Sequence, residues 1–223
     1  MSIRGRCCRW ESATLNRFDE KVKLYAFELT STAMHSRIGA NPITVITREV
    51  RAMPVSVTNS QLIYDSLKAC DIRLLSALPE TWLVHLIRMA DDDPDVQLVR
   101  LAKEEEGVGI SAGAHLAGVK SALLMQNHGF LQSVNGIVGV SRLYRIPLLM
   151  LISYRGEFGE RDPWQTEGGG VTEAVLHALN IPHQRLDEPG HVARRIRQAQ
   201  TLAEASLKPA ALLLGRDLMW EEQ

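Results

Sequence analysis

The sequence predicts an α/β fold: a doubly wound, mostly parallel sheet of six strands with helices on both faces. From residue 53 to the C-terminus, short apolar runs alternate with longer segments of helical pattern or of small residues. The most apolar run, residues 147–153 (PLLMLIS), shows no polar alternation, which predicts a central strand buried on both faces. Because strands that alternate with helices are joined by right-handed crossovers, this order of elements indicates a parallel sheet.

The individual elements follow from their patterns and boundaries. Asn59 or Ser60 can cap a first helix that runs to Ala69, with Ile63 and Leu67 on its apolar side. Strands are predicted at residues 72–78, 96–102, 122–126, 147–153, 183–186 and 210–214. Further helices are predicted at residues 81–90, 107–117, 131–144, 171–179 and 192–207.

Composition limits the function classes. The chain has 223 residues, 45% of them hydrophobic and 23% charged, which is typical of a soluble globular protein. A net charge of −1 gives no field that favours nucleic acid or a membrane surface as a partner. No apolar run approaches the roughly 20 residues that a membrane span needs. The cysteines Cys7, Cys8 and Cys70 are few and poorly spaced for disulfides, which indicates a reducing, cytoplasmic location.

The N-terminal segment differs from the rest of the chain. Residues 1–52 show no sustained hydrophobic period, and we expect a poorly ordered or atypical N-terminal extension there. Residues 53–223 form the predicted domain. Met53 is a candidate for the true start of translation. Mass spectrometry of the native N-terminus tests this expectation, and a chain that begins at residue 1 or 2 would contradict it.

Polar residues gather where two of the predicted strands end. Glu104, Glu105 and Glu106 follow the strand at 96–102 and precede a helix of very small residues. Gln126, Asn127, His128 and Gly129 follow the strand at 122–126. Since ligands of open parallel sheets bind outside the carboxyl ends of the strands, we expect a functional site at this edge.

The three glutamates allow two interpretations. Acidic residues at a helix N-terminus complement the helix dipole, and two of the three need do no more than that. Adjacent carboxylates also raise one another's pKa, so one that turns inward could act as a proton donor near neutral pH. The same carboxylates would repel a pyrophosphate, which argues against reading Gly107, Gly109 and Ala112 as a dinucleotide-binding fingerprint.

Two other residues are left with open alternatives. His128 either presents a polar group to a ligand or is a solvent-exposed loop histidine. Arg155 opens residues 154–170, a predicted loop with several glycines; it either belongs to a solvated loop or holds an anionic substrate through two parallel hydrogen bonds. The sequence shows no metal-ligand spacing, no G-x-S-x-G and no Walker lysine loop, and so we predict no metal site of its own.

Three segments, taken together and in order, resemble a known family. They are EEEGVGISAGAHLAG (residues 104–118), ALLMQNHG (122–129) and YRIPLLMLISYRGEFGERDPWQ (144–165). They resemble the α subunits of sulfopyruvate decarboxylase and the corresponding domain of phosphonopyruvate decarboxylase, both thiamine-diphosphate enzymes. The resemblance implies that residues 53–223 are the domain that binds the aminopyrimidine ring of the cofactor.

The resemblance also implies roles for individual residues. Glu104 would contact N1′ of the aminopyrimidine and exchange a proton with it, with Glu105 in this role if the register slips. The implied cofactor-binding residues are Glu104, Gln126, Asn127 and Gly129, and the implied substrate-binding residues are His128, Asn135, Arg155 and Gln165. The implied reaction converts 3-sulfopyruvate to sulfoacetaldehyde and carbon dioxide, a carboxy-lyase step of coenzyme M biosynthesis.

The family's G-D-G motif, which holds Mg²⁺ and the cofactor's diphosphate, does not occur in this chain. The resemblance therefore implies a hetero-oligomer, in which a separate β subunit carries the diphosphate-binding domain. The sequence departs from the family at His128, where serine is usual, at Leu131 and Gln132, where glycine and asparagine are usual, and at Thr166, where histidine is usual. These departures leave two alternatives: a subunit that decarboxylates phosphonopyruvate or another 2-oxo acid, and a non-catalytic cofactor-binding or scaffold subunit.

Overall fold

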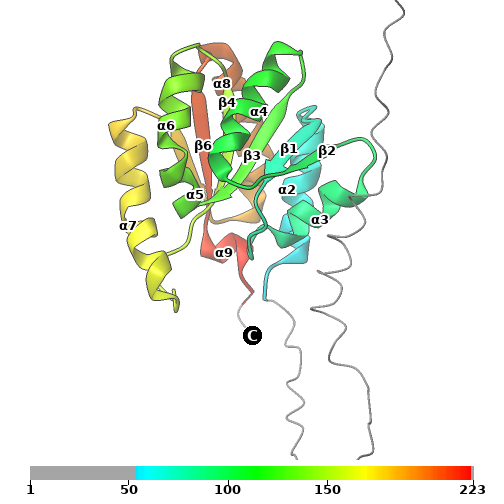
Figure 1. Cartoon of the computed structure of the whole chain (residues 1–223). Coiled ribbons are helices and arrows are strands. Elements are labelled where there is room, and N and C mark those ends of the chain that lie inside the picture. Colours follow the sequence, from blue (N-terminus) through cyan, green and yellow to red (C-terminus); the bar gives the residue numbers. More distant parts are fainter. Residues whose placement is uncertain (1–53, 222–223) are drawn as a thin grey trace, which may run out of the picture. The chain divides into compact units, whose positions relative to one another are not determined.

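The computed structural model describes residues 54–221, so the expectations for residues 1–52 and for Met53 lie outside the described part (Figure 1). Six strands form one sheet in the order β2-β1-β3-β4-β6-β5, and every neighbouring pair is parallel. The strands are β1 (Leu74–Ala77), β2 (Gln97–Arg100), β3 (Ser121–Gln126), β4 (Leu148–Ser153), β5 (His183–Leu186) and β6 (Pro209–Leu214). The predicted α/β fold with a parallel six-stranded sheet is confirmed.

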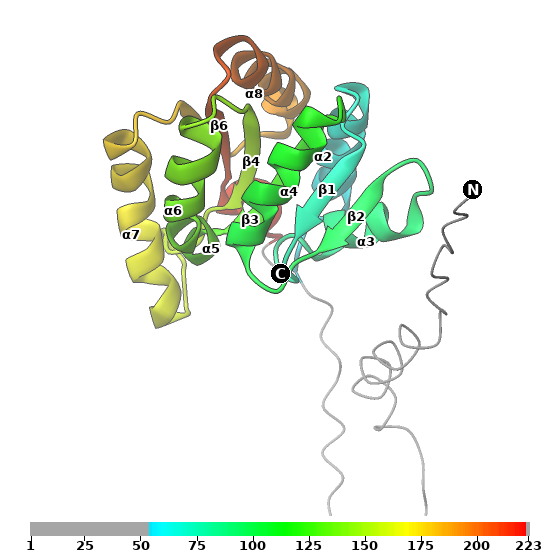
Figure 2. The ribbon, with the colours of Figure 1, turned by 45° about the horizontal axis from the view of Figure 1, so that its top comes forward.

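Helices cover both faces of this sheet (Figures 1 and 2). One layer is built by α2 (Val57–Ala69), α3 (Val84–Asp92) and α8 (Val192–Ser206). The opposite layer is built by α4 (Glu104–Leu116), α5 (Asn127–Gln132), α6 (Val134–Gly136), the π-helix η1 (Ile137–Arg142) and α7 (Pro163–Ala178). Two short elements complete the chain, the 3₁₀ turn η2 (Pro189–His191) before α8 and α9 (Arg216–Met219) after β6.

The core lies on both faces of strands β3, β4 and β6. Successive residues of a strand point to opposite faces, so Leu124 and Leu151 pack in the α2/α3/α8 layer while Leu123 and Met150 pack in the α4/α5/α7 layer. All six residues of β4 are buried, which confirms the prediction of a central strand. Burial of one such side chain contributes about 1.5–3 kcal/mol. The sheet therefore holds the carboxyl ends of β3 and β4 at fixed positions.

The first helix begins earlier than its predicted cap. Ser56 is the N-cap of α2, and its Oγ accepts a hydrogen bond from the backbone N of Asn59 at 3.3 Å. Asn59 and Ser60 lie inside the helix instead. The Asn59 side chain donates to the carbonyl of Leu218, and the Ser60 hydroxyl donates to the carbonyl of Ser56. The prediction of a cap at Asn59 or Ser60 was wrong, because both residues lie inside the helix and their side chains bind the carbonyls of Leu218 and Ser56 instead.

Two elements of the opposite layer also differ from the prediction. The helix predicted at 131–144 begins directly at Asn127 and continues as α5, α6 and η1. The loop predicted at 154–170 ends at Asp162, because α7 begins at Pro163, whose fixed φ suits the first helical position. Gly168 and Gly169 therefore lie within a helix, where close neighbours leave no room for a side chain. A Cβ on Gly168 would lie 2.6 Å from the His128 ring.

Candidate active site

Glu104 is the first residue of α4 and lies at the carboxyl edge of the sheet. Its side chain is buried, with 5% of its surface exposed. The side chain lies against Gly129 of α5, where a Cβ would come within 2.5 Å of Glu104 Cγ and Oε1. The Glu104 side chain can therefore occupy this position only because residue 129 is a glycine.

The three adjacent glutamates have different surroundings. Glu106 Oε2 accepts hydrogen bonds from the backbone N of Ala102 at 3.0 Å and of Lys103 at 3.4 Å, which is a capping role at the start of α4. Glu105 Oε1 accepts from Asn135 Nδ2 at 3.2 Å. Within residues 54–221, the Glu104 carboxylate forms no hydrogen bond or ion pair of this kind. Glu104 is therefore the one of the three that is both buried and free to meet a ligand.

Two buried amides at the end of β3, Asn127 and Gln165, have oxygen atoms that find no hydrogen-bond partner among residues 54–221. Asn127 is fully buried, and its Nδ2 donates to the carbonyl of Arg155 at 2.6 Å. Gln165 Nε2 donates to Gln126 Oε1 at 3.4 Å. Asn127 Oδ1 and Gln165 Oε1 accept no hydrogen bond from the described residues. An unsatisfied buried polar atom costs about 1–3 kcal/mol, so these two oxygens are suited to a ligand or water that donates to them.

Arg155 is engaged within the chain. Its Nε and Nη2 donate to the two carboxylate oxygens of Glu160 at 2.6 and 2.7 Å, and Nη2 also lies 2.8 Å from Asp162 Oδ2. The guanidinium carbon lies 5.1 Å from the centre of the Trp82 ring. These hydrogen bonds lower the pKa of Glu160 to about 2. The two-pronged geometry expected for an anionic substrate is thus formed with Glu160, and a substrate would have to compete with that pair.

The sequence did not single out one partly buried acid, Glu80. Glu80 follows β1, and its Oε2 accepts a hydrogen bond from the backbone N of Leu83 at 3.1 Å. Burial raises the pKa of Glu80, and the nearby charge of Arg155 acts in the opposite direction. A glutamate directly after Pro79 at a strand end was the available signal. Its electrostatic interaction with Arg155 joins positions too far apart in the sequence to be read from the pattern.

The remaining predicted residues lie at the rim. His128 is exposed in the first turn of α5, and its ring lies against Gly168 of α7. Asn135 is exposed on α6, where its partner is Glu105. The structure therefore brings Glu104, Gln126, Asn127, Gly129 and Gln165 together at the end of β3, with His128 and Asn135 outside this group. Their substrate-binding roles stay predictions.

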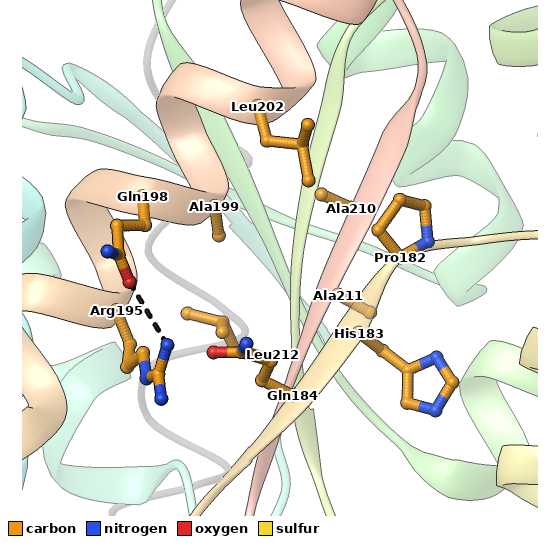
Figure 3. A pocket seen from close by; sticks show the side chains of 10 residues that line it. All are labelled: Pro182, His183, Gln184, Arg195, Gln198, Ala199, Leu202, Ala210, Ala211 and Leu212. Carbon is orange, nitrogen blue, oxygen red and sulfur yellow. Dashed lines mark hydrogen bonds between the residues drawn. The ribbon is translucent and has the colours of Figure 1, made fainter.

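A cavity of about 440 Å³ lies away from these residues, between α8 and the strands β5 and β6 (Figure 3). Arg195 projects into it and donates to Gln198 Oε1 at 3.2 Å. None of the predicted site residues lines this cavity. Among residues 54–221, no three His, Cys, Asp or Glu side chains gather in a way that could hold a metal ion. No helix in the same part of the chain is both long and apolar enough to cross a membrane.

The fold and the site define a class: a parallel α/β domain with a buried carboxylate and unsatisfied amides at the carboxyl edge of its sheet. No family model matches the chain. The α subunit of sulfopyruvate decarboxylase from Methanococcus maripaludis is 33% identical over 162 residues, which cover 73% of this chain and 96% of that protein. The chain therefore belongs to the family of sulfopyruvate decarboxylase α subunits.

Two longer proteins are similar to this chain over part of their length. Phosphonopyruvate decarboxylase from Streptomyces viridochromogenes is 27% identical over 111 residues, which are 49% of this chain and 28% of that protein. A solved structure of 2-oxoglutarate:ferredoxin oxidoreductase from Magnetococcus marinus matches with a TM-score of 0.53 and 18% identity. That match covers 92% of this chain but 35% of the other, and it supports the fold.

Proposed function

We propose that this chain is the α subunit of a cytoplasmic, thiamine-diphosphate-dependent decarboxylase that converts 3-sulfopyruvate to sulfoacetaldehyde and carbon dioxide. The observation that carries the proposal is the Glu104 carboxylate, buried against Gly129 at the carboxyl edge of the sheet and without a partner among the described residues. Membership of the sulfopyruvate decarboxylase family supports the reaction class. The few cysteines support the location.

The residues at this edge fit the aminopyrimidine ring of the cofactor. Such a ring offers a nitrogen that can exchange a proton with Glu104 and an amino group that can donate hydrogen bonds. Among residues 54–221, no group donates a hydrogen bond to the buried acceptors Asn127 Oδ1 and Gln165 Oε1, and Gln126 lies beside Gln165. Gly129 leaves the space in which the glutamate side chain lies.

The chain's own contribution is to position a proton. When bound, thiamine diphosphate supplies the electron-accepting centre that makes loss of carbon dioxide from a 2-oxo acid possible. Glu104 would hold or release a proton at the ring nitrogen of the bound cofactor. Asn127 fixes the end of β3 to the carbonyl of Arg155, which keeps the carboxylate and the amides in one arrangement.

The site needs a second chain to hold the other end of the cofactor. The chain lacks a G-D-G motif. The relative from Methanococcus maripaludis, 96% of which is covered by the match, is named as one subunit. The match to phosphonopyruvate decarboxylase covers about a quarter of that longer protein, which leaves room there for a second domain. We therefore assign the diphosphate and Mg²⁺ to a β subunit, in a hetero-oligomer that takes a small anionic 2-oxo acid as substrate.

Phosphonopyruvate is the second candidate substrate, because the chain also matches phosphonopyruvate decarboxylase. The rim residues His128, Leu131, Gln132 and Thr166, which depart from the family pattern, bear on this choice. Turnover of the two 2-oxo acids by the co-expressed pair separates the candidates. Turnover of neither would favour a non-catalytic scaffold subunit.

Glu104→Gln tests the proposal most directly. Glutamine keeps the size of the side chain but cannot transfer a proton, so we expect decarboxylation by the co-expressed pair to fall by about 100-fold or more, with an unchanged melting temperature. Glu105→Gln is the matched control, because Glu105 binds Asn135, and we expect activity within a few-fold of the unmodified pair. Activity of Glu104→Gln within a few-fold of the unmodified pair would contradict the proposed role.

A further inference from the structure

The peptide that joins Arg155 to Gly156 lies against both of the amides whose oxygens find no donor among residues 54–221. Asn127 Nδ2 donates to the carbonyl of Arg155 at 2.6 Å. Gly156 approaches α7 so closely that a Cβ on it would collide with the carbonyl of Gln165, and a Cβ on Gly169 would collide with the Arg155 carbonyl. The φ of Gly156 is +92°, which also favours glycine. The position of this peptide therefore decides where the side chains of Asn127 and Gln165 are placed.

Glu160 holds the same peptide through its carboxylate. The Glu160 side chain is buried, with 4% of its surface exposed. Its Oε2 accepts hydrogen bonds from Arg155 Nε at 2.6 Å and from the backbone N of Gly156 at 3.3 Å. Its Oε1 accepts from Arg155 Nη2 at 2.7 Å and from the backbone N of Arg161 and Asp162 at 2.9 and 3.1 Å. One carboxylate thus joins the end of β4 to Asp162, the N-cap of α7.

The surroundings of Arg155 favour a supporting role for this ion pair. The hydrogen bonds from Arg155 lower the pKa of Glu160 to about 2, so the carboxylate is charged at neutral pH. Asp162 is a second acidic partner of the guanidinium, which also lies over the ring of Trp82. An anionic 2-oxo acid would have to replace a charged partner that three backbone amides hold in place.

We propose that Glu160 is a positioning residue that fixes, through the Arg155–Gly156 peptide, the two amide oxygens that would receive the cofactor. The inference rests on the proposed function, which assigns the amides of Asn127 and Gln165 to the aminopyrimidine ring. Glu160 acts through the peptide rather than by contact with a ligand. Hydrogen bonds between charged groups are roughly twice as strong as those between neutral groups. A neutral side chain at position 160 would therefore hold the peptide less firmly and leave both oxygens less well placed.

The test measures how tightly thiamine diphosphate binds, without turnover. The co-expressed pair of this chain and the G-D-G chain is titrated with thiamine diphosphate by calorimetry in the presence of Mg²⁺. Because groups that support a binding residue are typically worth about 10-fold or more in affinity, we expect Glu160→Gln to raise the Kd by about 10-fold. The KM for the 2-oxo acid at saturating cofactor should change by less than about threefold, because the loss is one of cofactor binding.

Glu157→Gln is the matched control on the same segment. Glu157 also loses an ion pair in this variant, but its partner is Arg185 of β5 and not the Arg155–Gly156 peptide. Both side chains of this pair are partly exposed, and such pairs contribute little to stability. We expect the Kd for thiamine diphosphate to stay within about twofold of the unmodified pair.

Two results would overturn the inference and leave the proposed function standing. The first is an unchanged Kd for Glu160→Gln with a lower melting temperature, which would reduce the ion pair to a contribution to stability. The second is a lower KM for the 2-oxo acid, which would show that Glu160 competes with the substrate for Arg155.

Two further arms complete the experiment. If Glu160→Gln does not fold, Glu160→Asp replaces it. Aspartate keeps the charge but is one methylene shorter and cannot make all of these bonds from the same position, so the Kd should rise by about threefold, and an unchanged Kd would again overturn the inference. Failure of the unmodified pair to bind thiamine diphosphate would overturn the proposed function together with this inference.

Discussion

The two helical layers of this protein use their side chains differently. The α2/α3/α8 layer is packed with large apolar residues, such as Ile63, Leu86 and Ile196, which are fully buried. The α4/α5/α7 layer meets the sheet and its own helices through glycines and holds the buried polar groups Glu104 and Gln165. The difference indicates that one layer mainly stabilises the fold, while the other uses small residues to make room for buried polar groups.

Two glycines of the second layer, Gly107 and Gly169, are required by their neighbours rather than by their own conformation. A Cβ on Gly107 would collide with Leu123 Cδ1 and would lie 3.1 Å from Ser76 Oγ, so α4 approaches the sheet more closely than another residue would allow. A Cβ on Gly169 would collide with the carbonyl of Arg155. Because glycine in a helix costs about 0.5–1 kcal/mol relative to alanine, this layer is intrinsically less stable than its counterpart.

The largest effect on stability is expected in the apolar layer. Leu86→Ala removes a fully buried side chain of α3 and should lower the free energy of unfolding by about 2–5 kcal/mol. The activity per folded molecule should be retained, because Leu86 lies on the face of the sheet opposite to Glu104. Urea unfolding and turnover assays with the β subunit check the two parts. A loss of activity without a loss of stability would contradict the inference that the α2/α3/α8 layer mainly stabilises the fold.

A smaller loss is expected from Gly107→Ala in the second layer. The added methyl group must displace Leu123 or the helix itself, which should destabilise the fold by about 1–3 kcal/mol. Gly113→Ala on the same helix is the control, because no atom lies within 4 Å of its Cβ position, and it should raise stability by about 0.5–1 kcal/mol. Thermal unfolding of both variants measures the contrast. Equal effects at the two positions would mean that contact with the sheet does not explain Gly107.

The smallest expected effect is a change in how the free energy of unfolding depends on pH under acidic conditions. Hydrogen bonds from Arg155 hold the pKa of Glu160 at about 2, below its usual value of 4.5. A carboxyl group whose pKa is lower in the folded state contributes stability above its unfolded pKa, and that contribution is lost as the pH falls from about 4.5 towards 2. Glu160→Gln should therefore show a shallower fall in the free energy of unfolding over this range. Parallel curves for the two proteins would contradict the role of the ion pair.

The sequence predicted much of the fold but less of the site's internal bonding. Apolar runs were sufficient to predict all six strands. Burial on both faces leaves a strong pattern in the inner strands β1, β3, β4 and β6, whereas the edge strands β2 and β5 are partly exposed. The start of α7 could not be read, since Gly168 and Gly169 resemble loop residues until the His128 ring and the Arg155 carbonyl are seen against them. The pairing of Arg155 with Glu160 was also missed, because a guanidinium at a strand end has the same sequence signature whether its partner is internal or a substrate.

Asn127 links three elements at the carboxyl edge of the sheet. Its amide nitrogen binds the carbonyl of Arg155, and Gly169 of α7 abuts the same carbonyl, so β3, β4 and α7 meet at one oxygen atom. Displacement of any one of these elements should therefore move the other two. We therefore expect these three elements to be thermodynamically coupled, so that the effects of paired substitutions on different elements are not additive.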